Sequence, residues 1–364
     1  KYCDRTRENT ELLTSEHRLK TRDLARKSIV LLKNDKNVLP LPKDIGRIAV
    51  IGSLAKSKRD MLGCWSFTGD SKDAISIFDG IKAAVSPSTE VLYHKGCEVD
   101  SKTPENFDSA LEIAKAADVI IMVVGESADM SGEASSRTNI NIPGNQEELV
   151  LQMNKLGKPL IVLLSNGRPL TIPKLSENVS TIVETWFLGT EAGNAIADVL
   201  FGDYNPSGKL PVSFPVSLGQ VPLYYNQNST GRPLFETPNK KFRSRSIDCS
   251  NQALFPFGFG LSYTNFKYSN LKLDKLKMNK SDSLAISVDV ENTGTRQGEE
   301  VVQLYIHDLF ASICQPVKVL KRFEKISLQP LESKTVTVKL KVEDFKFHDK
   351  NMNWIVEPGD FDIL

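Results

Sequence analysis

Apolar runs bounded by glycines and charges alternate with segments of helical periodicity through the first part of the chain. Val119–Val124, between Asp118 and Gly125, is typical of a strand buried on both faces of a parallel sheet. The alternation predicts βαβ units and an α/β fold, a mostly parallel sheet between helical layers (an α/β sandwich). The other predicted strands are Arg47–Ile51, Glu90–Tyr93, Pro159–Leu164 and Val179–Glu184. The predicted helices are Thr14–Asn34, Ser76–Val85, Asn106–Ala117, Gly144–Leu156 and Glu191–Phe201.

The pattern changes after Gly202, where prolines, glycines and aromatic residues replace the periodic runs. From Leu271 onward, apolar and polar residues alternate with period two, as in Leu284, Ile286 and Val288. Short alternating strands separated by turns predict an antiparallel β-sandwich. We therefore expect an α/β domain over 15–230, an irregular linker over 231–262 and a β-sandwich over 263–364.

Composition excludes several classes of protein. The 364 residues carry a formal net charge of +1, which gives no basic face for nucleic acid. No apolar run approaches the ~20 residues of a transmembrane helix. The 4 histidines and 5 cysteines are scattered without zinc spacing, and we interpret the cysteines as small buried thiols. Neither a GxGxxG nor a GxxxxGK[ST] motif is present, so nothing favours a nucleotide site.

The best candidate site is the polar segment that follows Val119–Val124. It holds three carboxylates and an arginine, in the order Glu126, Asp129, Glu133 and Arg137. Ligands of open α/β sheets gather beyond the carboxyl ends of the strands, which is where this segment must lie. The alternative is an ordinary solvated loop. Trp65 and Phe67, in another loop, could stack on a sugar face, but a packing role is the favoured interpretation of these two aromatic residues.

A carboxyl group can act as a general acid near neutral pH when burial or a neighbouring negative charge raises its pKa. Glu133 lies between Gly132 and Ala134, whose small side chains leave it room to project. Arg137 could instead lower that pKa, or hold a substrate hydroxyl. Glycoside hydrolysis usually needs two carboxylates, and spacing alone does not select a pair.

Long stretches of the sequence resemble the bacterial periplasmic β-glucosidases of glycoside hydrolase family 3. The resemblance covers nearly the whole chain. It rests on ARKSIVLLKN, GEASSRTNINIP, NGRPL, ETWFLGTEAGNAIADVLFGDYNPSGKLPVSFP, FPFGFGLSYTNF, ENTGTRQGEEVVQLYI and LKRFEKISLQP.

The resemblance implies a three-domain enzyme: an N-terminal (β/α)₈ barrel, an α/β sandwich and a fibronectin type III-like domain. The barrel is missing from this sequence, so residues 1–14 would be a residual linker from it. The nucleophilic aspartate of the family lies on the barrel, whereas the EASSR glutamate, here Glu133, is the acid/base. Ser136 and Arg137 are then candidate substrate-binding residues, and no metal or cofactor is expected.

A retaining, exo-acting β-glucosidase, periplasmic or secreted, is therefore the function that the resemblance implies. The chain alone should be inactive, because its nucleophile would lie on the absent barrel, and a homodimer remains open. Without the barrel, the loop that carries Glu133 should be weakly held and its carboxylate solvated. The alternatives are a non-catalytic sugar-binding or assembly module, a β-xylosidase of the same family, or an N-acetylglucosaminidase. The EASSR stretch argues against the last of these.

Overall fold

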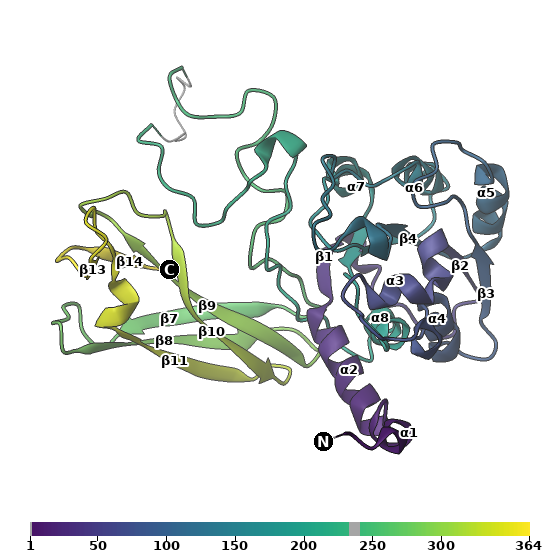
Figure 1. Cartoon of the computed structure of the whole chain (residues 1–364), viewed down its shortest axis with the longest axis horizontal. Helices are drawn as coiled ribbons and strands as arrows, with labels where there is room; N and C mark the ends of the chain where they lie inside the picture. Colours follow the sequence, from purple (N-terminus) through teal and green to yellow (C-terminus); the bar gives the residue numbers. More distant parts are fainter. Residues whose placement is uncertain (1, 233–240) are drawn as a thin grey trace. The chain divides into compact units, whose positions relative to one another are not determined.

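The computed structural model describes residues 2–232 and 241–364. These residues form two compact units, an α/β domain that ends near Leu210 and a C-terminal β-sandwich that starts near Ser262 (Figure 1). Of the segment between them, Phe214–Gly219 and Phe259–Leu261 group with the α/β domain, whereas Pro211–Ser213 and the described part of 220–258 group with the sandwich unit. Part of the irregular linker predicted over 231–262, namely 233–240, lies outside the described residues.

A six-stranded sheet forms the centre of the α/β domain, in the order β1-β6-β5-β4-β2-β3. Strand β1 is antiparallel to β6, and the remaining pairs are parallel. The predicted mostly parallel sheet is therefore confirmed. Its strands are β1 (Val30–Asn34), β2 (Arg47–Ile51), β3 (Glu90–His94), β4 (Val119–Gly125), β5 (Leu160–Ser165) and β6 (Thr181–Glu184).

Helices cover both faces of this sheet. Helices α5, α6 and α7 line one face, and α4 and α8 pack together on the other (Figure 1). All residues of β4 and β5 are buried, as expected for strands between two helical layers. The helices are α1 (Glu8–Glu11), α2 (Ser15–Ser28), α3 (Lys58–Leu62), α4 (Ile77–Ala84), α5 (Phe107–Ala116), α6 (Gln146–Asn154), α7 (Pro173–Asn178) and α8 (Ala192–Leu200).

The predicted helix Thr14–Asn34 is wrong over its last six residues. Helix α2 ends at Ser28, and Val30–Asn34 is instead the edge strand β1. Ile29 to Leu32 form an unbroken buried run that suits a strand paired with β6. Leu19 and Leu24 of α2 are 68% and 67% exposed.

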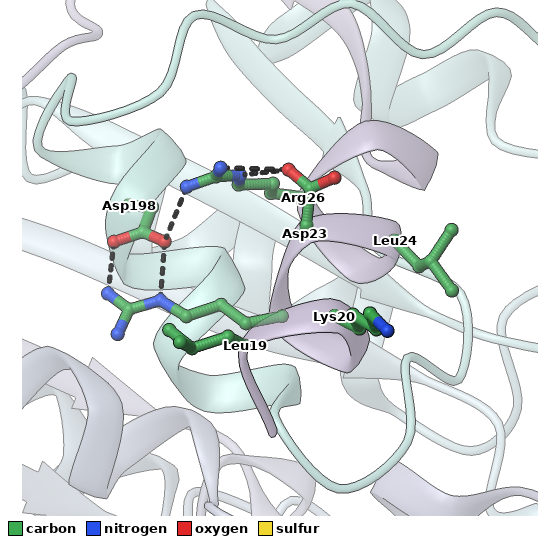
Figure 2. Close-up of a pocket in the computed structure, with 7 residues that line it drawn as sticks. Leu19, Lys20, Asp23, Leu24, Arg26 and Asp198 are labelled. Carbon is green, nitrogen blue, oxygen red and sulfur yellow. Dashed lines mark hydrogen bonds and ion pairs between the residues drawn. The ribbon is translucent and has the colours of Figure 1, made fainter. Parts of the chain in front are cut away.

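Polar contacts attach α2 to the rest of the domain. Asp198 of α8 is almost fully buried and accepts a hydrogen bond of 2.7 Å from Arg22 Nε. Figure 2 shows Arg26 beside the same carboxylate and Asp23, with Leu24 pointing away from them. A pocket of about 730 Å³ opens here, but each of its charged groups is already in an ion pair, so we assign it a structural role.

The C-terminal unit is the predicted antiparallel sandwich, fibronectin type III-like in fold. Two three-stranded sheets, β10-β9-β14 and β11-β8-β7, bury a core that includes Ile286, Leu304 and Leu340. Its strands are β7 (Phe266–Leu273), β8 (Ser283–Asn292), β9 (Gly298–Asp308), β10 (Val319–Leu328), β11 (Ser333–Lys341), β12 (Phe347–His348), β13 (Trp354–Ile355) and β14 (Phe361–Ile363).

Short 3-10 turns complete the described elements. They are η1 (Arg5–Arg7), η2 (Asp35–Asn37), η3 (Ser53–Lys56), η4 (Ser71–Asp73), η5 (Ala128–Met130), η6 (Leu218–Gln220) and η7 (Val342–Phe345). Of these, η5 matters most for the site, because it begins the loop that leads from β4 to Glu133.

Candidate active site

The candidate site is a pocket of about 560 Å³ at the carboxyl edge of the parallel sheet. The order of the strands reverses between β2 and β4, so ligands are expected at this edge. Loops that follow α3, β4, β5 and β6 line the pocket. The lining residues are Leu62, Gly63, Cys64, Trp65, Ser131, Gly132, Ser135, Asn166, Gly167, Arg168, Trp186 and Phe187.

Glu126 follows β4 directly and is fully buried. Its Oε1 lies 2.6 Å from Arg137 Nη1 and 3.2 Å from Arg168 Nε. The preceding residue, Gly125, lets β4 approach β5 closely, because a Cβ there would lie 2.0 Å from the carbonyl oxygen of Ser165. A buried carboxylate held by two guanidinium groups is a fixed structural charge and is shielded from any substrate.

Glu184, the last residue of β6, is a second fully buried carboxyl group at this edge. The Trp186 N–H donates to its Oε1 at 2.8 Å, and Asn166 Nδ2 donates to its Oε2 at 3.1 Å. Burial raises the pKa of Glu184 well above its usual value. The hydrogen bonds from Trp186 and Asn166 lower this pKa, and the charge of Glu126 raises it, but burial is the largest effect. Burial therefore favours the neutral form of Glu184.

Glu133 occupies the tip of a tight turn at the rim of the pocket. The Ser135 N–H donates to the carbonyl oxygen of Gly132 at 3.3 Å, so Glu133 and Ala134 are the two central residues. Ala134 has φ of +55°, a conformation that costs a residue with a Cβ free energy. Glu133 itself is exposed, which confirms the expectation of a solvated carboxylate.

The start of the loop is held more firmly than the sequence suggested. Ala128 is buried, and Asp60 of α3 accepts its N–H at 2.7 Å. Arg168 Nη2 donates to the carbonyl oxygen of Met130 and to Ser131 Oγ, the latter at 2.9 Å. The expectation of a weakly held loop is therefore wrong for the segment before Gly132, because polar contacts replace the missing apolar ones.

The other residues proposed from the sequence occupy different surroundings. Arg137 is mostly buried and donates to Glu126 and, at 3.1 Å, to the carbonyl oxygen of Asn141. Ser136, the residue that follows the turn, is exposed. Asp129 is 87% exposed and pairs with Arg59 at 3.3 Å. A substrate-binding role for Ser136 and Arg137 stays a prediction.

The aromatic residues of the neighbouring loop are not packing anchors. Trp65 lines the pocket with 60% of its surface exposed, and Phe67 is 91% exposed, which makes the favoured packing interpretation wrong. The interpretation of the cysteines as buried thiols was also largely wrong, since Cys3 and Cys314 are exposed. Cys97 is buried, and burial raises the pKa of its thiol to about 11.

Sequence reasoning missed Asn166, Arg168 and Glu184. Each lies at or just beyond the end of a predicted buried strand, and that position could have identified them. Asn166 is fully buried, and its Oδ1 has no hydrogen-bond partner among the described residues. Within the described ranges, no group of three or more potential ligands could hold a metal ion. The described helices are also too short or too polar to cross a membrane.

Residues 29–263 match the glycosyl hydrolase family 3 C-terminal domain, and residues 300–364 match a fibronectin type III-like domain. The chain belongs to glycosyl hydrolase family 3. A periplasmic beta-glucosidase of Salmonella typhimurium is 46% identical to it, over 96% of this chain and 48% of that protein. A beta-xylosidase of Formosa agariphila is 42% identical, over 98% and 49% respectively.

The structure of a beta-glucosidase from Listeria innocua in complex with isofagomine has the same fold. It superimposes with a TM-score of 0.92 at 38% identity, covering 100% of this chain and 51% of that one. The chain therefore spans about half the length of the family 3 proteins that it matches.

Proposed function

We propose that the chain is the C-terminal portion of a retaining, exo-acting β-glucosidase, in which Glu133 is the general acid/base. The observation that carries this proposal is the placement of Glu133 on an exposed turn whose flanking residues, Gly132 and Ser135, line the pocket. Glu126 and Glu184, the buried carboxyl groups behind the pocket, are committed to arginines or to backbone and amide donors. Of these three glutamates, Glu133 is thus the one that is free to reach a substrate, and Asp129, the other exposed carboxylate of the loop, pairs with Arg59.

In the full-length enzyme, meaning this chain joined to the N-terminal barrel, an aspartate of the barrel would attack the anomeric carbon. Glu133 would donate its proton to the glycosidic oxygen as the bond to the aglycone breaks. The resulting carboxylate of Glu133 would then take a proton from water, which attacks the anomeric carbon and releases glucose. Trp65 presents an exposed ring beside the pocket and is suited to stack on a sugar face.

The relatives support this substrate class. Solved structures of the beta-glucosidase from Listeria innocua include complexes with glucose and, for a mutant, with laminaribiose. The beta-xylosidase from Formosa agariphila makes terminal xylose the second candidate. Comparing aryl β-glucoside with aryl β-xyloside hydrolysis by the full-length enzyme separates the two. The periplasmic relative also supports a periplasmic or secreted location.

The test is the dependence of rate on the leaving group in the full-length enzyme. General acid catalysis contributes about 10²–10⁴-fold, and a good leaving group needs little of it. Glu133→Ala should therefore slow an aryl glucoside with a poor leaving group far more than one with a good leaving group. Asp129→Ala, which removes another exposed carboxylate of the same loop, is the matched control and should have little effect.

An equal loss on both substrates, or a larger selective loss in Asp129→Ala, would show that Glu133 is not the acid. The chain without its barrel should hydrolyse neither substrate, since the proposed nucleophile lies outside it. Turnover by the purified chain would contradict the division of the active site between this chain and the barrel. It would also exclude the alternative that the chain is a non-catalytic module.

A further inference from the structure

The turn that carries Glu133 has little to hold it in place. Residues 133–136 are all exposed, and the backbone contact that closes the turn is the single hydrogen bond from Ser135 to Gly132. Positioning an acid to within a fraction of an ångström requires support from neighbouring groups. That support must act on the residues where the turn begins and ends.

Two arginines provide contacts on either side of the turn. Before it, Arg168 donates to the carbonyl oxygen of Met130 and to the hydroxyl of Ser131. After it, Arg137 belongs to the loop itself, and its Nη2 donates to the carbonyl oxygen of Asn141. Each arginine therefore fixes one end of the segment that contains Glu133.

Both arginines also contact one carboxylate, that of Glu126. Its side chain is fully buried, while those of Arg137 and Arg168 are 20% and 21% exposed. The backbone N–H of Glu126 donates to the carbonyl oxygen of Ser165 at 2.8 Å, which ties the backbone of Glu126 to the adjacent strand β5. Charge-assisted hydrogen bonds in such surroundings are short and directional, so they can transmit the position of the sheet to the loop.

Packing at Gly167 supports the same arrangement independently. A Cβ added to Gly167 would lie 2.5 Å from Ser131 Oγ and 3.0 Å from Ser131 Cβ. The loop after β5 therefore approaches the start of the turn more closely than a larger residue would allow. Arg168, the next residue, reaches Met130 and Ser131 from this position.

We propose that Glu126 is a positioning residue for Glu133, acting through Arg168 before the turn and Arg137 after it. The proposal rests on the function proposed above, because it assigns a purpose to the position of Glu133. Glu126 is not itself a catalytic residue, since it is fully buried and paired on both oxygens. Its carboxylate fixes both ends of the turn relative to β4 and leaves the tip free to meet the substrate.

The first test uses Glu126→Gln in the full-length enzyme, because glutamine keeps the shape and removes the charge. If Glu126 positions the acid, kcat/KM should fall at least tenfold for a poor leaving group and change less than threefold for a good one, within the range of general acid catalysis. The double variant Glu126→Gln/Glu133→Ala should be no slower than Glu133→Ala on the poor leaving group. Once the acid is removed, a residue that only positions it has nothing further to contribute to the rate. Equal losses on both substrates, or additive losses, would overturn the proposal.

Matched variants separate positioning from a general loss of structure. Glu90→Gln removes the acid of an Arg–Glu pair, with Arg47, near the amino ends of β2 and β3, and should alter neither substrate. Arg137→Lys keeps a positive charge beside Glu126 but cannot span Glu126 and Asn141 together, so it should show the leaving-group effect in milder form. If Glu126→Gln fails to fold, Arg137→Lys decides, and an unchanged leaving-group profile there overturns the proposal.

Amide hydrogen exchange distinguishes failure of this proposal from failure of the proposed function. Exchange of the hydrogen-bonded amides of Met130, Ser131 and Ser135 should be at least about tenfold faster in Glu126→Gln than in the parent enzyme, and unchanged in Glu90→Gln. If Glu133→Ala shows no leaving-group selectivity, the proposed function falls, and exchange alone then decides whether Glu126 positions the turn. Unchanged exchange of these amides would overturn it.

Discussion

The carboxyl groups at the carboxyl edge of the sheet and the carboxylate on the turn beside it differ in burial and in how firmly they are held. Glu126 and Glu184 lie at the ends of β4 and β6, fully buried, and their oxygens are committed to fixed partners. Glu133 lies a few residues from Glu126 in sequence, yet its side chain is exposed on a turn of four residues. The rigid carboxyl groups therefore shape this edge of the sheet, whereas the accessible one is the acid/base that we propose.

The largest expected difference between the two regions is in stability. Glu126→Ala should lower the free energy of unfolding of the α/β domain by about 3–5 kcal/mol, because it leaves two largely buried guanidinium groups without their partner. Glu133→Ala should change it by no more than about 0.5 kcal/mol, as an exposed substitution. Urea denaturation of the chain followed by circular dichroism measures both. Similar losses of unfolding free energy in Glu126→Ala and Glu133→Ala would contradict the distinction between a firmly held carboxylate at the sheet edge and an unconstrained one on the turn.

The second difference is the pH dependence that Glu184 imposes. Its pKa is raised in the folded state, above the ordinary value of 4.5, chiefly by burial. The folded protein therefore keeps a proton that the unfolded chain releases. The stability contributed by the neutral form is complete below the unfolded pKa and is lost as pH rises toward the folded pKa.

Glu184→Gln removes this titration and keeps an acceptor for the Trp186 N–H. The stability of Glu184→Gln relative to the parent should rise by up to about 1.4 kcal/mol for each pH unit above the unfolded pKa. Denaturation curves of both proteins at about pH 5 and about pH 7 give the comparison. A constant difference between these pH values would mean that Glu184 is ionised in the folded protein.

The hydrophobic pattern of the sequence predicted the strands better than it predicted the ends of the helices. Apolar runs such as Val119–Val124 predicted β4 and its neighbours, because burial on both faces leaves a continuous pattern. The predicted range for helix α2 was too long, because the apolar run Ile29–Leu32 by itself suits either a helix or a strand. Pairing of this segment with β6 makes it a strand. Glu133 was identified through the family resemblance, whereas its exposure followed from its polar surroundings.

The pairing of Glu126 with Arg137 and Arg168 was not predictable from sequence. Arg168 lies 42 residues from Glu126 along the chain, and only the parallel pairing of β4 with β5 brings the ends of these strands together. The sequence also presented Glu126, Asp129 and Glu133 as equivalent carboxylates of one loop. Burial separates Glu126 from the other two, which are both exposed, and burial is a property of the folded sheet.

A further expected effect concerns the geometry of the turn itself. Ala134 has a positive φ, which a β-branched residue tolerates poorly. Ala134→Val should destabilise the domain by about 1–3 kcal/mol relative to Ala134→Gly. Ser136→Val, an exposed residue of the same loop without a positive φ, is the control and should cost less. Equal costs for valine at 134 and 136 would show that the turn is free to change its conformation.

The most direct measurement of the central claim is the product formed when azide is added to full-length Glu133→Ala. Azide attacks a glycosyl-enzyme without needing a base, so it should accelerate turnover of an aryl β-glucoside that has a good leaving group. Two successive displacements at the anomeric carbon give β-glucosyl azide, which the coupling of the anomeric proton identifies by NMR. We predict acceleration and the β product. An α-glucosyl azide would make Glu133 the nucleophile, and no acceleration would contradict its role as the acid/base.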